Sequence, residues 1–174
     1  YSQNIDEHNA VEVYYDNCGA EGNLFAQHLT QGFAYDRGEN SDPQIRYSFK
    51  PNEEVDASNT AEERSFCYHY DSIIFSYSDL DPNALYWVKV TYLQEKGGKR
   101  IQSLDVDGFI LHDSMEIPEN TAKKFIYPIP PSAYSDGKIQ LRFNRISGLN
   151  AVVSEVMIYR ASKGGAIPIV YEGD

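Results

Sequence analysis

Two runs of β-forming residues, 85–93 and 101–111, constrain the fold of this chain most strongly. Both are rich in β-branched and aromatic residues, and their side chains show the period of two that is typical of strands. A glycine-containing turn at 96–99 joins the two runs, and Asp107-Gly108 is a hairpin signal inside the second run. The sequence therefore predicts a stack of antiparallel strands, with any functional residues on strand faces or in the loops between strands.

Further segments carry the same signature and are separated by turns. They lie at 10–15, 44–49, 65–70, 73–77, 124–131, 138–146 and 151–160. The pattern contains neither a clear amphipathic helix nor a repeat of roughly 20 to 50 residues. It predicts an all-β antiparallel sandwich or jelly roll. We expect a single domain over 1–160, followed by a tail or linker at 161–174 that contains Gly164, Gly165 and Pro168.

The strand expected at 85–93 has two different faces. One face collects only apolar or aromatic side chains: Tyr86, Val88, Val90 and Tyr92. We expect this face to point into the core. Trp87 lies on the opposite face beside Lys89. The single tryptophan is predicted to be buried against the second sheet, with an exposed platform for a ligand as the alternative.

The charge of the chain limits its partners. The formal net charge is −11 and there is no basic patch, so nucleic acid and anionic membranes are poor partners. No apolar run approaches the ~20 residues that a membrane-spanning helix needs. The acidic excess is explained either by solubility or by a calcium ion or a neutral or basic ligand.

The two cysteines, Cys18 and Cys67, are far apart in the sequence. A disulfide between them would close a long loop and stabilise the fold by ~4 kcal/mol in the chain-entropy description. Two buried free thiols are the alternative. The sequence has no CxxC motif and no Cys/His cluster with the spacing of a zinc site.

The order of segments in the second half resembles the galactose-binding-like and malectin-like β-sandwiches of carbohydrate-binding modules. The matching residues are a strand at 86–92, a hairpin at 104–108, a strand that ends in prolines, an alternating strand at 136–143 and a last strand at 147–159. The first strand at 10–15 matches as well, whereas 25–78 does not. The resemblance implies a secreted or cell-surface module that holds a linked enzyme near a plant or microbial polysaccharide.

Sugar binding requires aromatic rings that stack on the apolar face of a pyranose, together with polar groups that bind its hydroxyls. The segment 33–40 supplies Tyr35, Arg37 and Asn40 within a few residues. A second group consists of Tyr68, His69 and Tyr70. In a strand, the two tyrosines would point the same way and the histidine the opposite way. They are expected either to form an exposed platform or to pack into the core.

The resemblance also implies a structural calcium ion near the first and last strands, held by carboxylate and backbone oxygens. Glu12, Asp16 and Glu155 lie in these stretches. The sequence Asp105-Val106-Asp107-Gly108 lacks the spacing and the distal glutamate of an EF-hand loop, and we interpret it as a hairpin turn.

Catalytic motifs are weak in this sequence. The four histidines are scattered, no G-x-S-x-G nucleophile elbow is present, and 26 acidic residues make any pair of carboxylates uninformative. The leading hypothesis is a non-catalytic carbohydrate-binding module. The alternatives are a structural or protein-interaction sandwich of a multidomain secreted protein, and a small polysaccharide lyase or hydrolase.

Overall fold

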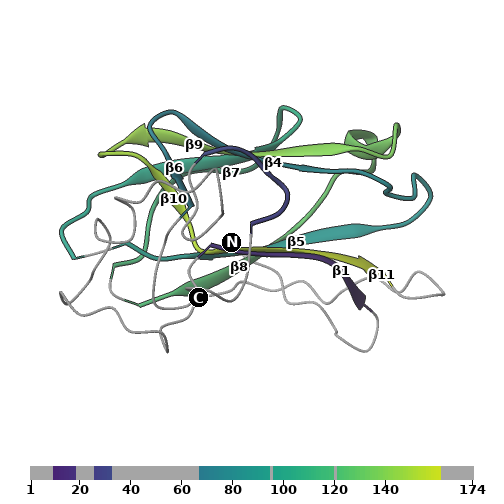
Figure 1. Ribbon diagram of the computed structural model, residues 1–174, viewed down its shortest axis with the longest axis horizontal. Coiled ribbons are helices and arrows are strands. Elements are labelled where there is room, and N and C mark those ends of the chain that lie inside the picture. Colours follow the sequence, from purple (N-terminus) through teal and green to yellow (C-terminus); the bar gives the residue numbers. More distant parts are fainter. Residues whose placement is uncertain (1–9, 19–25, 33–66, 95, 120, 162–174) are drawn as a thin grey trace.

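The computed structural model describes residues 10–18, 26–32, 67–94, 96–119 and 121–161. These residues form β-strands and one short 3₁₀ helix (Figure 1). The strands are β1 (Ala10–Asn17), β2 (Leu29–Gln31), β3 (Cys67–His69), β4 (Ser72–Tyr77), β5 (Tyr86–Tyr92), β6 (Ile101–Val106), β7 (Phe109–Glu116), β8 (Lys123–Pro128), β9 (Ile139–Ser147), β10 (Ala151–Val153) and β11 (Glu155–Ala161), and the 3₁₀ helix is η3 (Pro131–Tyr134).

Two antiparallel sheets form the layers of a sandwich (Figure 1). One sheet has four strands in the order β1-β11-β5-β8, and the other has five in the order β2-β4-β9-β6-β7. The short strands β10 and β3 pair with each other in a small third sheet. The predicted fold class, an all-β antiparallel sandwich, is confirmed.

The turn at Asp107-Gly108 closes the β6–β7 hairpin as predicted. Both residues have positive φ, 48° and 89°, which is the backbone that a two-residue turn between twisted strands prefers. The connection at 96–99 has a different role, because β5 belongs to the four-stranded sheet and β6 to the five-stranded sheet. This connection therefore crosses between the layers.

The core lies between the two sheets, and one face of β5 contributes to it as predicted. Tyr86, Val88, Val90 and Tyr92 all belong to this core. The prediction that Trp87 is buried against the second sheet is wrong. Trp87 is only 4% exposed, but it packs with Ile126 and Ala161 in a separate cluster. The strand period places it beside Lys89, on the face that points away from the second sheet.

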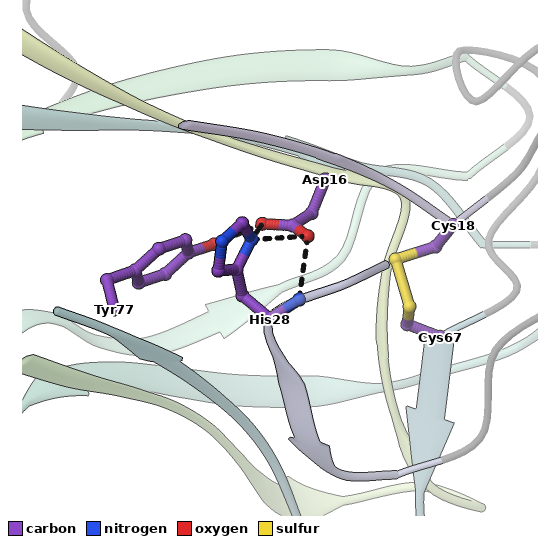
Figure 2. Close-up of a disulfide and its surroundings, with 5 residues drawn as sticks. All are labelled: Asp16, Cys18, His28, Cys67 and Tyr77. Carbon is purple, nitrogen blue, oxygen red and sulfur yellow. Dashed lines mark hydrogen bonds and ion pairs between the residues drawn. A yellow bond between two sulfur atoms is a disulfide. The ribbon is translucent and has the colours of Figure 1, made fainter. Parts of the chain in front are cut away.

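Cys18 and Cys67 form a disulfide that joins the end of β1 to the start of β3 (Figure 2). The bond spans 49 residues of sequence, so it stabilises the folded state by about 4 kcal/mol in the chain-entropy description. The alternative of two free thiols is thereby excluded.

The predicted strands at 10–15, 73–77 and 138–146 correspond to β1, β4 and β9, each with slightly different ends. The expected strand at 151–160 is instead divided at Ser154 into β10, which pairs with β3, and β11, which pairs with β1 and β5. The strand expected at 44–49 and nearly all of the expected tail at 161–174 lie outside the described residues. Within the described part of the chain, no helix has the length and apolar character needed to cross a membrane.

Candidate functional site

A tight turn between β3 and β4 holds the second group of predicted ligand-binding residues. His69 is the last residue of β3, and its Nδ1 accepts hydrogen bonds from the backbone N–H groups of Asp71 and Ser72, at 3.0 and 3.1 Å. Because both partners are donors, Nδ1 carries no proton in this arrangement. The His69 Nδ1 atom therefore stabilises the turn, and its acceptor capacity is occupied by these two backbone groups.

Tyr68 and Tyr70 lie together beside this turn. Their ring centroids are 5.8 Å apart and the rings meet edge to face, with an interplanar angle of 82°. Tyr68 is half-buried against the core, whereas Tyr70 is 55% exposed. The two rings therefore do not form a flat platform. One exposed phenol ring is supported from the side by a second one that the fold holds in place.

Arg145 fixes the backbone behind Tyr70. Its Nε donates to the Tyr70 carbonyl at 2.6 Å, one of its Nη atoms donates to the Gly148 carbonyl at 3.3 Å, and its backbone N–H donates to the Asp71 carbonyl at 2.8 Å. The guanidinium therefore joins the β3–β4 turn to the β9–β10 turn. Two apolar side chains nearby in sequence are also exposed, Ile146 near the end of β9 and Leu149 in the second turn.

We define a surface group that we call the tyrosine corner. It consists of the exposed residues Tyr70, Arg145, Ile146 and Leu149 and of the half-buried residues Tyr68 and His69. Its position at the end of β3 and β9 follows from the pairing of β3 with β10 and of β4 with β9. The other predicted ligand-binding residues, Tyr35, Arg37 and Asn40, lie outside the described residues. A role of the tyrosine corner in ligand binding stays a prediction.

Asp16, one of the predicted calcium ligands, is fully buried and satisfied by protein partners (Figure 2). Its carboxylate faces His28 Nδ1 at 3.0 Å and accepts the His28 backbone N–H at 3.0 Å. Tyr77 donates its hydroxyl to the same carboxylate at 2.7 Å. Burial, and then the charge of Asp16, raise the pKa of Tyr77 well above its usual value, so the phenol stays a donor.

Glu155, a second predicted calcium ligand, forms a different buried network. Thr91 donates its hydroxyl to Glu155 Oε1 at 2.7 Å, and Tyr15 donates to Oε2 at 2.5 Å. Asn17 in turn donates to the Tyr15 hydroxyl at 2.9 Å. Burial and the Glu155 carboxylate together raise the pKa of Tyr15 far above its usual value. Both oxygens of this carboxylate are therefore occupied by donors from the protein.

The three predicted calcium ligands do not meet in one site. Glu155 pairs with Asn17 and Asp16 pairs with Val156 across β1 and β11, so the two carboxylates point to opposite faces of the sheet. Glu12 is exposed on β1 and lies several residues away. Among the residues that the structure describes, no three histidine, cysteine, aspartate or glutamate side chains converge as a metal site would require.

The sequence alone did not reveal these two acid networks. Their partners are tyrosine, threonine, asparagine and histidine residues that lie up to 140 positions away in the sequence. Glu155 lies inside the strand expected at 151–160 and Asp16 directly follows the strand expected at 10–15, and neither position indicates the partners of these acids.

Comparison with known proteins finds no matching family among protein-family profiles and no matching sequence among curated proteins. Solved structures do match. The ectodomain of ANX2 from Arabidopsis thaliana aligns with a TM-score of 0.58 at 8% identity, over 95% of this chain and 54% of that one. FER, a plant protein solved in complex with the peptide RALF23 and with LLG2, aligns with a TM-score of 0.56 at 12% identity, over 92% and 52%.

A family 35 carbohydrate-binding module from Clostridium thermocellum aligns with a TM-score of 0.39 at 14% identity, over 64% of this chain and 85% of the module. This chain spans about half the length of the two plant structures and 12% of a Bacteroides uniformis beta-glucuronidase that also matches.

These likenesses concern the fold. The β-sandwich fold that the resemblance implies is confirmed by structures that share the arrangement of strands at low sequence identity. The disulfide is a bond that forms and persists in oxidising compartments such as the cell exterior.

Proposed function

We propose that this chain is a non-catalytic glycan-binding domain of a secreted or cell-surface protein, and that it holds a linked catalytic domain near a polysaccharide. The tyrosine corner supplies the observation that carries this proposal. It presents an exposed phenol ring on a backbone that Arg145 holds through two hydrogen bonds, to the carbonyls of Tyr70 and Asp71. An amphipathic ring on a rigid loop offers large contact area at low conformational cost.

The ligand chemistry follows from the groups at the corner. The ring of Tyr70 would lie against the C–H face of a pyranose, and its hydroxyl would bind a sugar hydroxyl. The exposed side chains of Ile146 and Leu149 would extend the apolar contact. A saccharide is favoured over a purely apolar ligand, because the phenol carries a hydroxyl beside its apolar ring.

Affinity electrophoresis of the full chain through gels that contain soluble polysaccharides tests this proposal. We expect retardation by at least one polysaccharide and about tenfold weaker binding for Tyr70→Ala, which corresponds to about 1.4 kcal/mol. Tyr70→Phe keeps the ring and should retain most of the binding. Ile110→Ala removes another exposed apolar side chain, on β7, and should not change the retardation. Equal retardation of Tyr70→Ala and the wild type would contradict the role of the tyrosine corner.

A protein or peptide ligand at the same corner is the second candidate function. It is favoured by the exposure of Tyr70, Ile146 and Leu149, and by the fold shared with FER, which was solved in a complex with the peptide RALF23 and with LLG2. A polysaccharide panel without any retardation, together with a peptide that loses affinity for Leu149→Ala, would favour it over glycan binding. A structural calcium ion stays a prediction of the resemblance, with Glu12 as the one exposed carboxylate of the three proposed ligands.

A further inference from the structure

A concave surface lies at the end of the five-stranded sheet that is opposite to the tyrosine corner. Strands β4 and β9 run antiparallel, with Ser72 opposite Asn144 near the corner and Tyr77 opposite Ile139 at the other end. The two ends are about 17 Å apart along the strands. An open groove of about 720 Å³ lies at the Tyr77 end. This volume falls within the range of roughly 300 to 1,000 Å³ that is common for small-ligand sites.

The groove brings together groups from four separate segments. Phe109, at the start of β7, is 41% exposed and lines it. Ser76 and Gln140 line the side formed by β4 and β9, and Asp107 and Lys138 lie in the adjoining turns. An aromatic ring, a hydroxyl, an amide and a carboxylate around one open cavity are the groups that recognise a saccharide.

The walls of the groove are fixed by hydrogen bonds within the protein. The Asp107 backbone N–H donates to the Gln140 carbonyl at 3.1 Å, and the Gln140 N–H donates to the Asp107 carboxylate at 3.3 Å. On the other side, the Asp136 carboxylate accepts the Lys138 N–H at 3.0 Å, which closes the turn before β9. The two turns that carry the charged groups are therefore held in position before any ligand arrives.

The charge of the groove selects among saccharides. Its lining contains two carboxylates, Asp107 and Asp136, against one ammonium group, Lys138. Burial raises the pKa of the Asp107 carboxyl, and the neighbouring charges of Asp136 and Asp105 raise it further. Burial is the main cause of this shift, and the selection against a sugar that carries its own carboxylate rests on the two carboxylates that outnumber the one ammonium group in the lining.

We propose that this groove is a second ligand-binding site, separate from the tyrosine corner, and that it binds a neutral oligosaccharide. The ring of Phe109 stacks on one sugar, the Asp107 carboxylate accepts hydrogen bonds from sugar hydroxyls, and Gln140 donates and accepts them. The inference shares the ligand class of the proposed function, but it stands on different residues at the other end of the sheet.

Amide chemical shifts of the isotopically labelled full chain locate the site without relying on a variant. The probes are cellohexaose, xylohexaose and mannohexaose as neutral ligands, and trigalacturonate as an acidic one. We expect at least one neutral hexasaccharide to shift the amides of 76–78, 107–109 and 135–140. These shifts should persist in Tyr70→Ala, because the groove does not include the corner.

Variants then test the groove itself. Phe109→Ala and Asp107→Asn should each weaken binding at the groove by about tenfold, or about 1.4 kcal/mol. Asparagine tolerates the positive φ of position 107 and keeps an oxygen for the Gln140 N–H. The matched controls are Ile110→Ala, whose side chain is 68% exposed, and Asp113→Asn; neither residue lines the groove, and both should bind as the wild type does.

The outcomes separate the two proposals. Shifts that map only to the tyrosine corner, or that disappear in Tyr70→Ala, would overturn the second site and leave the proposed function intact. Shifts confined to the groove would support the second site and contradict the tyrosine corner. Trigalacturonate that binds the groove as tightly as the neutral ligands would overturn the assigned ligand class. Absence of shifts with the whole panel would count against both proposals.

Discussion

The outward-facing sides of the two sheets differ. In β9 of the five-stranded sheet, Ile139, Leu141 and Phe143 are buried, whereas Gln140 and Arg142 between them are exposed. In β5 of the four-stranded sheet, every residue is buried except Lys89, which is half-buried. The strand β9 therefore presents polar side chains to solvent on one face, whereas β5, inside the four-stranded sheet, is buried on both faces.

This difference indicates which sheet faces can carry ligand-binding residues. Trp87 and Thr91 lie on the outer face of the four-stranded sheet, where burial makes them structural. The outer face and the ends of the five-stranded sheet carry the exposed polar and aromatic groups, including both proposed ligand sites. The two strands already differ in sequence, because β9 alternates strictly and β5 is nearly continuous in its apolar and aromatic residues.

The largest effect on stability is expected when substitutions of Trp87 and Ile110 are compared. Trp87→Ala should lower the free energy of unfolding by about 3–5 kcal/mol, because it empties a buried cluster. Ile110→Ala, on the other sheet, should change it by no more than about 0.5 kcal/mol. Urea denaturation followed by fluorescence and circular dichroism measures both. Similar losses in the two variants would show that the two outer faces do not differ as described.

A smaller effect is expected for the hydroxyl groups on the two faces. Thr91→Val removes a donor from the buried Glu155 carboxylate and should cost about 2 kcal/mol, since hydrogen bonds to charged groups are strong. Ser72→Ala removes a donor to the Asn144 amide in the more open network of the other sheet, and should cost about 0.5 kcal/mol or less. Midpoints of chemical denaturation compare the pair. A larger loss for Ser72→Ala would reverse the comparison.

The smallest effect on stability is expected from His112, which joins the two sheets through its hydrogen bond with Tyr92. His112 of β7 donates from Nδ1 to the Asp113 carbonyl at 2.8 Å and accepts the Tyr92 hydroxyl at Nε2 at 2.7 Å. Burial lowers the pKa of His112 below its usual value of 6.5, so the unfolded chain binds a proton more readily than the folded one. This contribution to stability is present above pH 6.5 and is lost as the pH falls toward the folded-state pKa.

The pH dependence can be isolated with His112→Gln, whose amide keeps an acceptor for Tyr92 but does not titrate. Between about pH 7.5 and about pH 5, the wild type should lose more stability than the variant. Parallel curves of unfolding free energy against pH for the two proteins would show that His112 does not contribute. The acidic residues common to both proteins serve as the internal control.

Much of the fold could be predicted from the sequence, since alternation is a local signal. The strands β1, β4, β5 and β9 and the β6–β7 hairpin were predicted in this way. The three-residue strand β2 was missed because it is too short to show a period in a loop-rich region. Whether a strand is covered on its second face depends on distant packing, which is why Trp87 was expected to face the wrong side.

The candidate sites were less accessible to sequence reasoning. Tyr70 could be identified because an aromatic beside a turn is a local feature, but its edge-to-face contact with Tyr68 depends on the turn geometry. The groove combines segments that are up to 64 positions apart, and no motif connects them. The resemblance implied Asp16 and Glu155 as metal ligands, and the sequence does not show the tyrosine and threonine donors that these carboxylates accept from.

Tyr77 connects two parts of the molecule. Tyr77 is among the residues that line the groove, and its hydroxyl, buried in the core, donates to Asp16, which His28 also contacts. This part of the groove wall is thus anchored by a carboxylate in the core, two residues from the disulfide. A sugar entering there would pay little entropic penalty for ordering that wall. Phe109 and Lys138, which line the same groove, have no comparable anchor in the described core and can adjust to the shape of the ligand.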